Sequence, residues 1–278
     1  MLLKNKTAVI YGADGSIGGA VAREFTREGA RLFVTGRTRE KLEAVTSEIT
    51  AEGGSAEVAV LDALDEQAVE EHAQAVVSQA GSIDVSFNLI TRGDVQTIPL
   101  VEMKTEDFVQ PVINGIISNF ITARAAARHM IERGSGVILA LGSGSANGSP
   151  MMGGTGPADG ATDAFIRNLA AEIGPQGVRV LGIWTAGLPE TMSVEKLAPY
   201  TGGQQMDEAA FQGFIENLDG MRMTRRSSTF AEVVGTAAFL ASDRAGVITG
   251  TLVNITSGMF PSQRISPPMT TWRQEKAA

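Results

Sequence analysis

A glycine-rich turn follows the first apolar segment and has the spacing of a phosphate-binding loop. Residues 7–11 form a β-rich run, and the turn 12–18 leads from it into a helical pattern. Glycine permits φ > 0 in a tight turn and lets the backbone approach a pyrophosphate, and the helix N-terminus offers free N–H groups. A plain strand-to-helix turn is the alternative, but this context favours a bound dinucleotide. The residues expected to bind it are Gly12, Ser16, Ile17 and Gly18.

A cationic stretch after the second β-rich run, 31–35, bears on which dinucleotide binds. NAD-binding chains place a carboxylate here for the ribose 2′-hydroxyl, whereas this chain has Arg37 and no acidic residue before Glu40. A guanidinium matches a phosphate through its planar fork of donors, and a cation at a helix N-terminus otherwise opposes the helix dipole. We therefore expect NADP(H), with Arg37 on the 2′-phosphate, and NAD(H) is the less favoured alternative.

Two carboxylates and two aromatic residues are further candidates for chemistry. Asp159 and Asp163 are four residues apart in a helical segment, so they share one helix face. Such a pair can serve as acid and base, although a solvated helix face is the commoner explanation. Trp184 ends a β-rich run and either stacks on a flat or cationic substrate or packs in the core. Tyr200 lies in the irregular region before the last helix and is a candidate substrate-contacting residue that closes over the site as a substitute acid.

Short β-rich segments alternate with amphipathic helical segments along the chain. This alternation predicts an α/β fold, a single-domain Rossmann-like doubly wound parallel sheet of seven strands with helices on both faces. The strands are expected at 7–11, 31–35, 56–61, 84–88, 136–141, 179–184 and 251–255. The helices are expected at 17–28, 39–51, 66–80, 105–133, 158–173 and 231–241.

One domain, 1–260, is expected, followed by a C-terminal tail, 261–278. The irregular region 188–228 interrupts the alternation of strands and helices before the last helix. An insertion at the carboxyl edge of a parallel sheet is where a substrate lid would lie. A surface excursion with its own small core is the alternative.

The composition excludes several classes of function. Acidic residues outnumber basic ones 31 to 23, which gives a net charge of −8 and argues against nucleic acid or an anionic membrane as a partner. The chain has no Cys, and only His72 and His129 could supply imidazole, so no metal site is expected. The N-terminus does not have the pattern of a signal peptide, and no apolar run is long enough to span a membrane. We expect a cytoplasmic protein that acts on a small molecule.

Several motifs together resemble the short-chain dehydrogenase/reductase family, over nearly the whole chain. Gly12 and Gly18 fit the family's Thr-Gly-x-x-x-Gly-x-Gly turn, with Tyr11 in place of Thr and Ser16 in place of the middle Gly. Residues 239–243 and 248–250 are close to the family's C-terminal signature. The resemblance implies further cofactor contacts at Asp62, Ala63, Asn88, Gly187 and Thr191. It also implies that Asn114 and Ser143 match the Asn and Ser of the family's catalytic tetrad.

The resemblance breaks at the family's catalytic Tyr-x-x-x-Lys. Alignment from the helical segment 167–170 places Thr155 at the Tyr position and Asp159 at the Lys position. A phenol has a pKa of about 10, which a nearby ammonium lowers toward neutrality, whereas a Thr hydroxyl is far too weak an acid for this role. An Asp anion would also raise the pKa of a neighbouring acid. The family's usual route of carbonyl reduction therefore cannot run with these residues.

Three functions are compatible with this pattern. The first is a reductase for an iminium, whose charge Asp159 would stabilise, or for a conjugated C=C bond, with an oxyanion site made by Ser143 and Asn114. The second is a dinucleotide-binding protein without redox chemistry. The third is a non-redox enzyme for elimination, isomerisation or cyclisation, with Asp159 or Asp163 as base. The chain keeps more of the family's cofactor-binding motifs than of its proton-donating residues, which favours the reductase.

The two longest helical segments predict self-association. Both are rich in alanine, which lets helices of two subunits pack closely, and the family resemblance implies a homotetramer. The alanines in question are Ala123, Ala125, Ala126, Ala127, Ala161, Ala164, Ala170 and Ala171.

Overall fold

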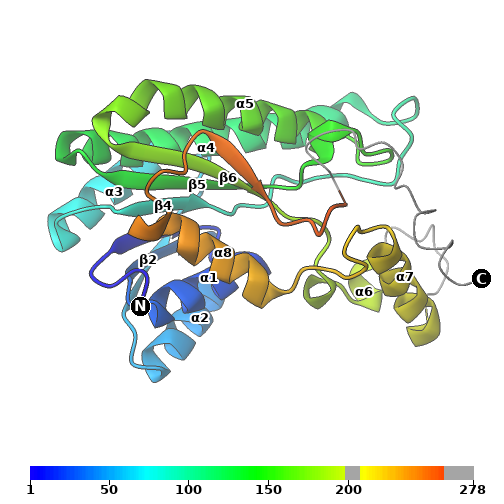
Figure 1. Ribbon diagram of the computed structural model, residues 1–278, viewed down its shortest axis with the longest axis horizontal. Helices are drawn as coiled ribbons and strands as arrows, with labels where there is room; N and C mark the ends of the chain where they lie inside the picture. Colours follow the sequence, from blue (N-terminus) through cyan, green and yellow to red (C-terminus); the bar gives the residue numbers. More distant parts are fainter. Residues whose placement is uncertain (198–206, 260–278) are drawn as a thin grey trace, which may run out of the picture.

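A seven-stranded parallel sheet forms the centre of the molecule (Figure 1). The computed structural model describes residues 1–197 and 207–259. The strand order is β3-β2-β1-β4-β5-β6-β7, and all neighbouring strands run parallel. This confirms the predicted α/β class, and the expected C-terminal tail lies outside the described residues. The strands are β1 (Thr7–Tyr11), β2 (Arg31–Gly36), β3 (Ala56–Val60), β4 (Val85–Asn88), β5 (Gly136–Gly142), β6 (Val178–Trp184) and β7 (Thr251–Asn254).

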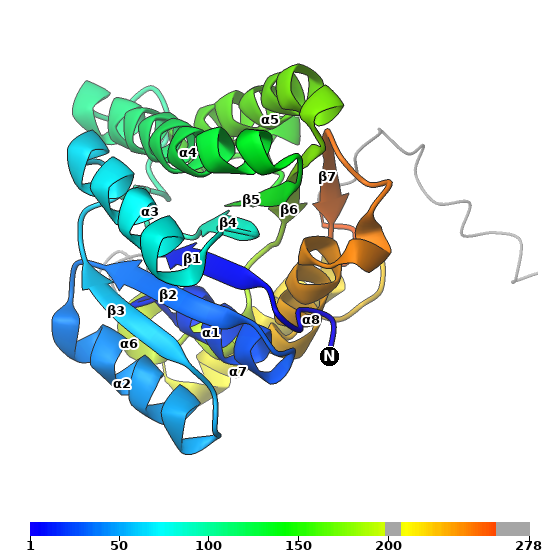
Figure 2. The ribbon, with the colours of Figure 1, turned by 90° about the vertical axis from the view of Figure 1, so that its left-hand side faces the viewer.

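Helices cover both faces of the sheet. Figure 2 shows α3, α4 and α5 on one face and α1, α2 and α8 on the other. The helix bounds are α1 (Ser16–Arg27), α2 (Arg39–Ala51), α3 (Glu66–Ala80), α4 (Thr105–Arg133), α5 (Thr155–Ile173) and α8 (Phe230–Ala241). Each agrees with the sequence prediction within three residues. None of the helices in the described part of the chain combines the length and the apolar character that a membrane span requires.

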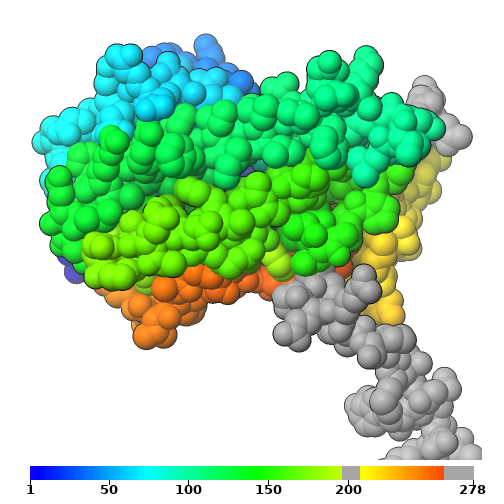
Figure 3. All heavy atoms as spheres, turned by 90° about the horizontal axis from the view of Figure 1, so that it is seen from above, coloured from blue at the N-terminus to red at the C-terminus, as the bar shows by residue number. Residues whose placement is uncertain are grey.

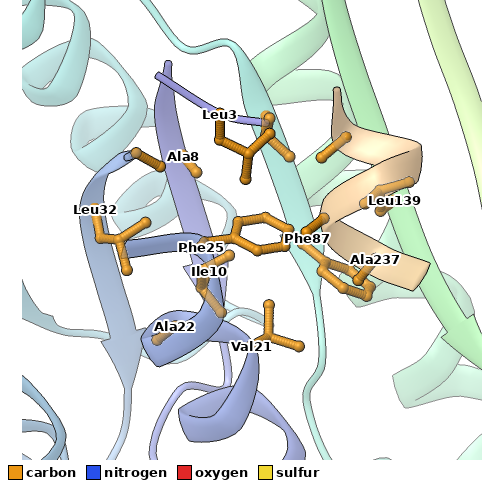
Figure 4. Close-up of a cluster of buried hydrophobic side chains, with 14 of the residues drawn as sticks. Leu3, Ala8, Ile10, Val21, Ala22, Phe25, Leu32, Phe87, Leu139 and Ala237 are labelled. Atoms are coloured by element: carbon orange, nitrogen blue, oxygen red, sulfur yellow. The ribbon is translucent and has the colours of Figure 1, made fainter. Parts of the chain in front are cut away.

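The core lies in two layers because successive strand residues point to opposite faces of a sheet. In β1, Val9 packs toward α3 and α4, whereas Ile10 packs toward α1 and α8. Figure 4 shows the second layer, in which Phe25 of α1 meets Ile10 and Phe87. All of these side chains are buried, and the burial of each one contributes roughly 1.5–3 kcal/mol to the free energy of folding.

The order of the strands creates a crevice at the carboxyl edge of the sheet. From β1 the chain winds outward through β2 and β3, and it then returns to β4 on the other side of β1. Connections that leave β1 and β4 in opposite directions leave a gap above the ends of these two strands, where doubly wound folds bind their ligands. The turn after Tyr11 and the segment after Asn88 both open into this crevice.

The expected insertion 188–228 contains helices that the sequence analysis did not predict. A short helix, α6 (Val194–Leu197), and a longer one, α7 (Glu208–Gly220), lie beyond the end of β6 (Figure 1). Asp207 begins α7, because its carboxylate accepts a hydrogen bond from the backbone of Ala210. The region therefore has regular structure of its own at the carboxyl edge of the sheet.

The alanines of α4 do not form an exposed face, so that part of the sequence argument is wrong. Ala123, Ala125, Ala126 and Ala127 are buried within the single chain, as is Ala170 of α5, whereas Ala161 of α5 is half-buried and Ala164 and Ala171 are exposed. Figure 3 shows the face on which α4 and α5 lie side by side. The large apolar residues exposed on α4 are Ile113, Ile117, Phe120 and Ile131.

Candidate active site

The glycine-rich turn has the shape that a dinucleotide phosphate requires. Gly12 has φ +81°, and a Cβ on it would lie 2.7 Å from the carbonyl oxygen of Leu89. A Cβ on Gly18 would lie 2.1 Å from the carbonyl oxygen of Gly12. Helix α1 begins at Ser16 without a side-chain cap, so its first N–H groups are left for a ligand. These residues therefore fit a nicotinamide dinucleotide.

The groove beside this turn contains a carboxylate that the sequence analysis missed. Asp14 Oδ2 accepts hydrogen bonds from the backbone N–H groups of Arg37 (3.1 Å) and Thr38 (3.2 Å). Asp14 belongs to the glycine turn, 23 positions before Arg37, so the spacing along the chain gave no sign of this contact. Arg37 and Lys41 line the same groove. The end of β2 thus combines two cations with one anion.

The other expected cofactor residues lie along the same edge. Asp62 and Ala63 line the groove, and Asp62 Oδ1 accepts a hydrogen bond from the backbone of Leu64 at 3.0 Å. Asn88 is buried, and its Nδ2 donates to Ser118 Oγ at 3.1 Å, which fixes the end of β4.

The segment after β6 carries the last two expected cofactor residues. The Gly187 carbonyl accepts a hydrogen bond from Arg222 Nη2 at 2.7 Å. Thr191 Oγ1 donates to the Leu188 carbonyl at 2.7 Å. Arg222 is buried at 1% exposure, and it connects this segment to the part of the insertion that follows α7.

The carboxylate of Asp159 is the centre of the predicted catalytic group. Its Oδ2 accepts hydrogen bonds from Ser143, through N (3.0 Å) and Oγ (2.5 Å), and from Ser145, through N (3.1 Å) and Oγ (2.8 Å). Its Oδ1 accepts from Arg92 Nη1 at 2.7 Å. The side chain is fully buried. Asp159 therefore meets five donors and no solvent.

The pKa of Asp159 is lowered despite its burial. Burial alone raises the pKa of a carboxyl group, but the charge of Arg92 and the hydrogen bonds from Ser143, Arg92 and Ser145 outweigh it. The expectation that Asp159 offers an uncompensated anion to a substrate is thus wrong, because Arg92 is its counter-ion. A lowered pKa and full enclosure also make it a poor general base.

A second carboxylate, Asp94, shares the same guanidinium. Arg92 Nε donates to Asp94 Oδ2 at 3.3 Å, and Arg92 Nη2 lies 3.2 Å from Asp94 Oδ1. Thr155 Oγ1 donates to Asp94 Oδ1 at 2.8 Å and accepts from Gln96 Nε2 at 3.3 Å. One guanidinium and two carboxylates leave this cluster with a formal charge of −1. We call Arg92, Asp94 and Asp159 the charge cluster.

The fold makes room for Arg92 on helix α4. A Cβ on Gly115 would lie 2.9 Å from Arg92 Cδ, so glycine is needed where the side chain crosses the helix. Asn114 Nδ2 donates to the Arg92 carbonyl at 3.0 Å and holds its backbone. The sequence does not point to Arg92 or Asp94. The one signal is that Leu89, Ile90 and Thr91, which follow Asn88, depart from the Asn-Asn-Ala-Gly segment found there in the family that the chain resembles.

The four predicted catalytic residues thus converge, but they do not form the expected oxyanion site. The Ser143 hydroxyl donates to Asp159, and the Asn114 amide donates to the Arg92 carbonyl. Neither of these donor groups points to a substrate. The Thr155 hydroxyl likewise donates to Asp94. The hydrogen-bond donors of this group are directed inward, onto the charge cluster and the Arg92 backbone.

Of the two aromatic candidates, the structure describes Trp184, which does not line the reaction site. Trp184 is 7% exposed, and its Nε1 donates to Asp163 Oδ1 at 3.0 Å, so it packs in the core and the predicted stacking on a substrate is wrong. Burial raises the pKa of Asp163, the Trp184 hydrogen bond lowers it, and the net shift is upward. Tyr200 lies outside the described residues. Tyr11, the other tyrosine, is fully buried in β1.

A pocket next to the cofactor groove opens onto the charge cluster. It lies beside the end of β4 and the segment after β5, and the charged residues that line it are Arg92 and Asp94. Its polar lining also includes Asn88, Thr91, Ser118, Asn119, Ser143 and Thr185. It shares Leu89, Ile90 and Thr91 with the groove that contains Arg37. A cofactor in the groove would therefore reach this pocket with its other end.

Comparison with known proteins agrees with this geometry. Residues 12–260 match the family model described as enoyl-(acyl carrier protein) reductase. The chain is 30% identical over 267 residues to the short-chain reductase protein NovJ of Streptomyces niveus, an alignment that covers 92% of this chain and 94% of NovJ.

Two sugar or polyol dehydrogenases are similar over comparable lengths. L-Rhamnose 1-dehydrogenase (NAD(P)(+)) of Azotobacter vinelandii is 29% identical over 266 residues, with 94% of this chain and 98% of the relative covered. The structure of NAD⁺-bound xylitol dehydrogenase superposes with a TM-score of 0.82 at 26% identity, over 93% of this chain and all of the other. The chain therefore belongs to the short-chain dehydrogenase/reductase family of oxidoreductases.

Proposed function

We propose that this protein is an NADP(H)-dependent reductase of a small organic substrate whose reducible group is an iminium. The observation that carries this proposal is the charge cluster, in which two carboxylates surround one guanidinium beside the cofactor groove. A pocket that adjoins a cluster with surplus negative charge favours a cation and disfavours the oxyanion that forms when a ketone is reduced.

An iminium suits a site whose donor groups are already engaged. A bound nicotinamide cofactor supplies a hydride, and Gly12, Ser16, Ile17 and Gly18 would hold its phosphates. The iminium carbon accepts the hydride and its C=N electron pair moves to nitrogen, which gives a neutral amine without a proton transfer. Ketone reduction would need an acid, and in the described part of the chain Tyr11 is a buried phenol whose pKa is raised mainly by burial.

A conjugated C=C bond is the second candidate, and Arg92 is the observation that favours it. Its side chain is 15% exposed and lines the pocket, so it faces the developing charge of an enolate. The two carboxylates that already pair with Arg92 weaken this effect. The iminium therefore remains the preferred substrate class.

The preference for NADP(H) rests on the balance of charges at the end of β2. Arg37 and Lys41 both line the groove beside Asp14, which supports binding of a 2′-phosphate, and the other carboxylates of the groove, Asp62 and Asp107, come from after β3 and from α4. Asp14 works against it, because its carboxylate already accepts the N–H groups at the start of α2. We expect NADP(H) to bind more tightly than NAD(H), with Asp14 reducing the difference.

The other two functions are less well supported by the geometry. Asp159 is enclosed and Asp163 bonds to Trp184, so neither is placed as the base of an elimination, isomerisation or cyclisation. A protein that binds the dinucleotide without turnover would have no need of a charged pocket beside the nicotinamide end of the groove.

The same proposal includes a cytoplasmic homotetramer with a lid. The exposed apolar residues Ile113, Ile117 and Phe120 on α4 support a contact between subunits. The segment 188–228 is proposed to close over the site, and the bond from Arg222 to the Gly187 carbonyl supports a link between the two.

The test is a comparison of substrates of one shape and different charge. N-methyl dihydroisoquinolinium and tetralone are both bicyclic, and one is a permanent cation. We expect NADPH-dependent turnover of the iminium with a kcat/KM at least about tenfold above that of the ketone. Ketone turnover that equals or exceeds iminium turnover would contradict the proposal, and so would binding of NADPH without turnover of either compound or of a conjugated enone.

A further inference from the structure

We propose that Asp94 is the residue that contacts the cationic group of the substrate. This inference rests on the proposed function and assigns its substrate specificity to one side chain in the segment after β4. The sequence analysis pointed to Asp159 for this role, because that residue stands where the family has its Lys.

Asp159 is excluded as the substrate contact because its side chain has no exposed surface. Its side chain has 0% exposure, and its two oxygens accept five hydrogen bonds from Ser143, Ser145 and Arg92. Its charge is compensated where it lies, by the Arg92 guanidinium at 2.7 Å. Asp159 is thus a positioning residue that fixes Arg92 and the segment after β5.

Asp94 differs from Asp159 in both exposure and bonding. Its side chain is 21% exposed and lines the pocket, and it is the one carboxylate among the described residues that line it. Its Oδ2 accepts one hydrogen bond, from Arg92 Nε, so this oxygen has remaining acceptor capacity. Because Arg92 is shared with the enclosed Asp159, the surplus charge of the cluster faces the pocket through Asp94.

Two side chains, Arg92 and Thr155, hold Asp94 in this place. The Arg92 guanidinium contacts both of its oxygens, and the Thr155 hydroxyl donates to Oδ1 at 2.8 Å. Gln96 in turn donates to Thr155 Oγ1. Thr155 stands at the position of the family's catalytic Tyr, and its hydroxyl here orients a carboxylate. A carboxylate fixed in this way can bind a cation without first losing side-chain freedom.

The experiment measures binding of the same two probes by calorimetry to the protein without cofactor. We expect the wild type to bind N-methyl dihydroisoquinolinium at least about tenfold more tightly than tetralone. Asp94→Asn should weaken iminium binding about tenfold and leave tetralone binding within about twofold. Asp94→Glu, which keeps the charge, should retain most of the preference. Glu71→Gln on the exposed side of α3 removes one surface charge and should change neither value.

The outcomes separate this inference from the proposed function. If the wild type does not prefer the cation, the proposed function fails. If the wild type prefers the cation and folded Asp94→Asn keeps that preference, the role of Asp94 is overturned and the proposed function stands. Circular dichroism checks the fold, and if Asp94→Asn does not fold, Asp94→Ser is the second neutral replacement and must show the same loss of preference.

Discussion

The groove that contains Arg37, here called the cofactor end, and the adjoining pocket that contains Arg92 and Asp94, here called the reaction end, satisfy their polar groups in different ways. At the cofactor end, helix α1 begins at Ser16 without a side-chain cap, which leaves backbone N–H groups for a ligand, and charged residues such as Arg37 lie at the surface. At the reaction end, Asp159 is enclosed, Arg92 is 15% exposed, and the side-chain donors bond to the two carboxylates and to the Arg92 carbonyl. The cofactor end is therefore built to receive an anion, whereas the reaction end has satisfied its own charges and leaves one carboxylate facing the pocket.

The largest expected effect is a loss of stability when the ion pair between Asp159 and Arg92 is removed. Asp159→Asn leaves Arg92 with one carboxylate fewer and places an amide N–H₂ among groups that are themselves donors. Removing one partner of a buried ion pair costs about 3–5 kcal/mol, and we expect a loss of this size in the free energy of unfolding, measured with urea.

Asp163→Asn is the matched control on the same helix face. The pKa of Asp163 is raised by burial, so its charged form is less favoured in the fold, and an Asn oxygen still accepts from Trp184. We expect it to lose about 1 kcal/mol or less. Equal losses in the two variants would show that Asp159 does not differ from an ordinary buried carboxylate.

A smaller effect is expected at the cofactor end. Arg37→Asp should weaken NADPH binding by roughly 1.5–3 kcal/mol, about tenfold to a hundredfold, and spare NADH, because the lost partner is the 2′-phosphate. Fluorescence titration of the bound reduced cofactors measures both. Asp14→Asn should have the opposite effect and tighten NADPH binding, because it removes a negative charge near the 2′-phosphate. Arg37 has no part in the choice of cofactor if both cofactors lose affinity equally or neither does.

The smallest effect concerns His72, beneath the cofactor end on α3. Its ring lies against Tyr11 and Phe33 with centroid distances of 6.4 Å, and burial lowers its pKa to about 4. The unfolded chain takes up a proton at a pKa of about 6.5, so the stability is complete above that pH and falls as the pH drops toward 4. We expect a loss of about 1–2 kcal/mol between pH 7 and about pH 5, measured by urea unfolding.

His72→Phe isolates this effect, because phenylalanine keeps the ring contacts and does not titrate. The difference in stability between the variant and the wild type should grow in favour of the variant as the pH falls. A constant difference across this range would mean that His72 does not bind its proton more weakly in the folded state.

The two ends also differ in how much the sequence predicts. The cofactor end follows from local rules, since the positions of Gly12 and Gly18 relative to β1 and α1 determine the turn. Asp14 is the exception, because its contact with Arg37 and Thr38 depends on how the turn packs against the end of β2. The β-α alternation likewise predicts the sheet, whereas α6 and α7 of the 188–228 insertion were not predicted.

The reaction end depends on contacts between residues far apart in the chain. Arg92 and Asp159 are 67 positions apart, and Asp94 and Thr155 are 61 apart. The alignment correctly brings Asn114, Ser143, Thr155 and Asp159 together. It does not show that Arg92, from the segment after β4, pairs with Asp159, because no local pattern marks a side chain that crosses another helix at Gly115.

The most direct test of the central claim is the pH dependence of hydride transfer to a permanently charged iminium. Stopped-flow absorbance of NADPH in a single turnover with N-methyl dihydroisoquinolinium isolates this step. Because the account requires no proton donor, it predicts a rate that is constant from roughly pH 6 to pH 9. A rate that rises or falls with the titration of one group across this range would show that an acid or base takes part and would contradict the account.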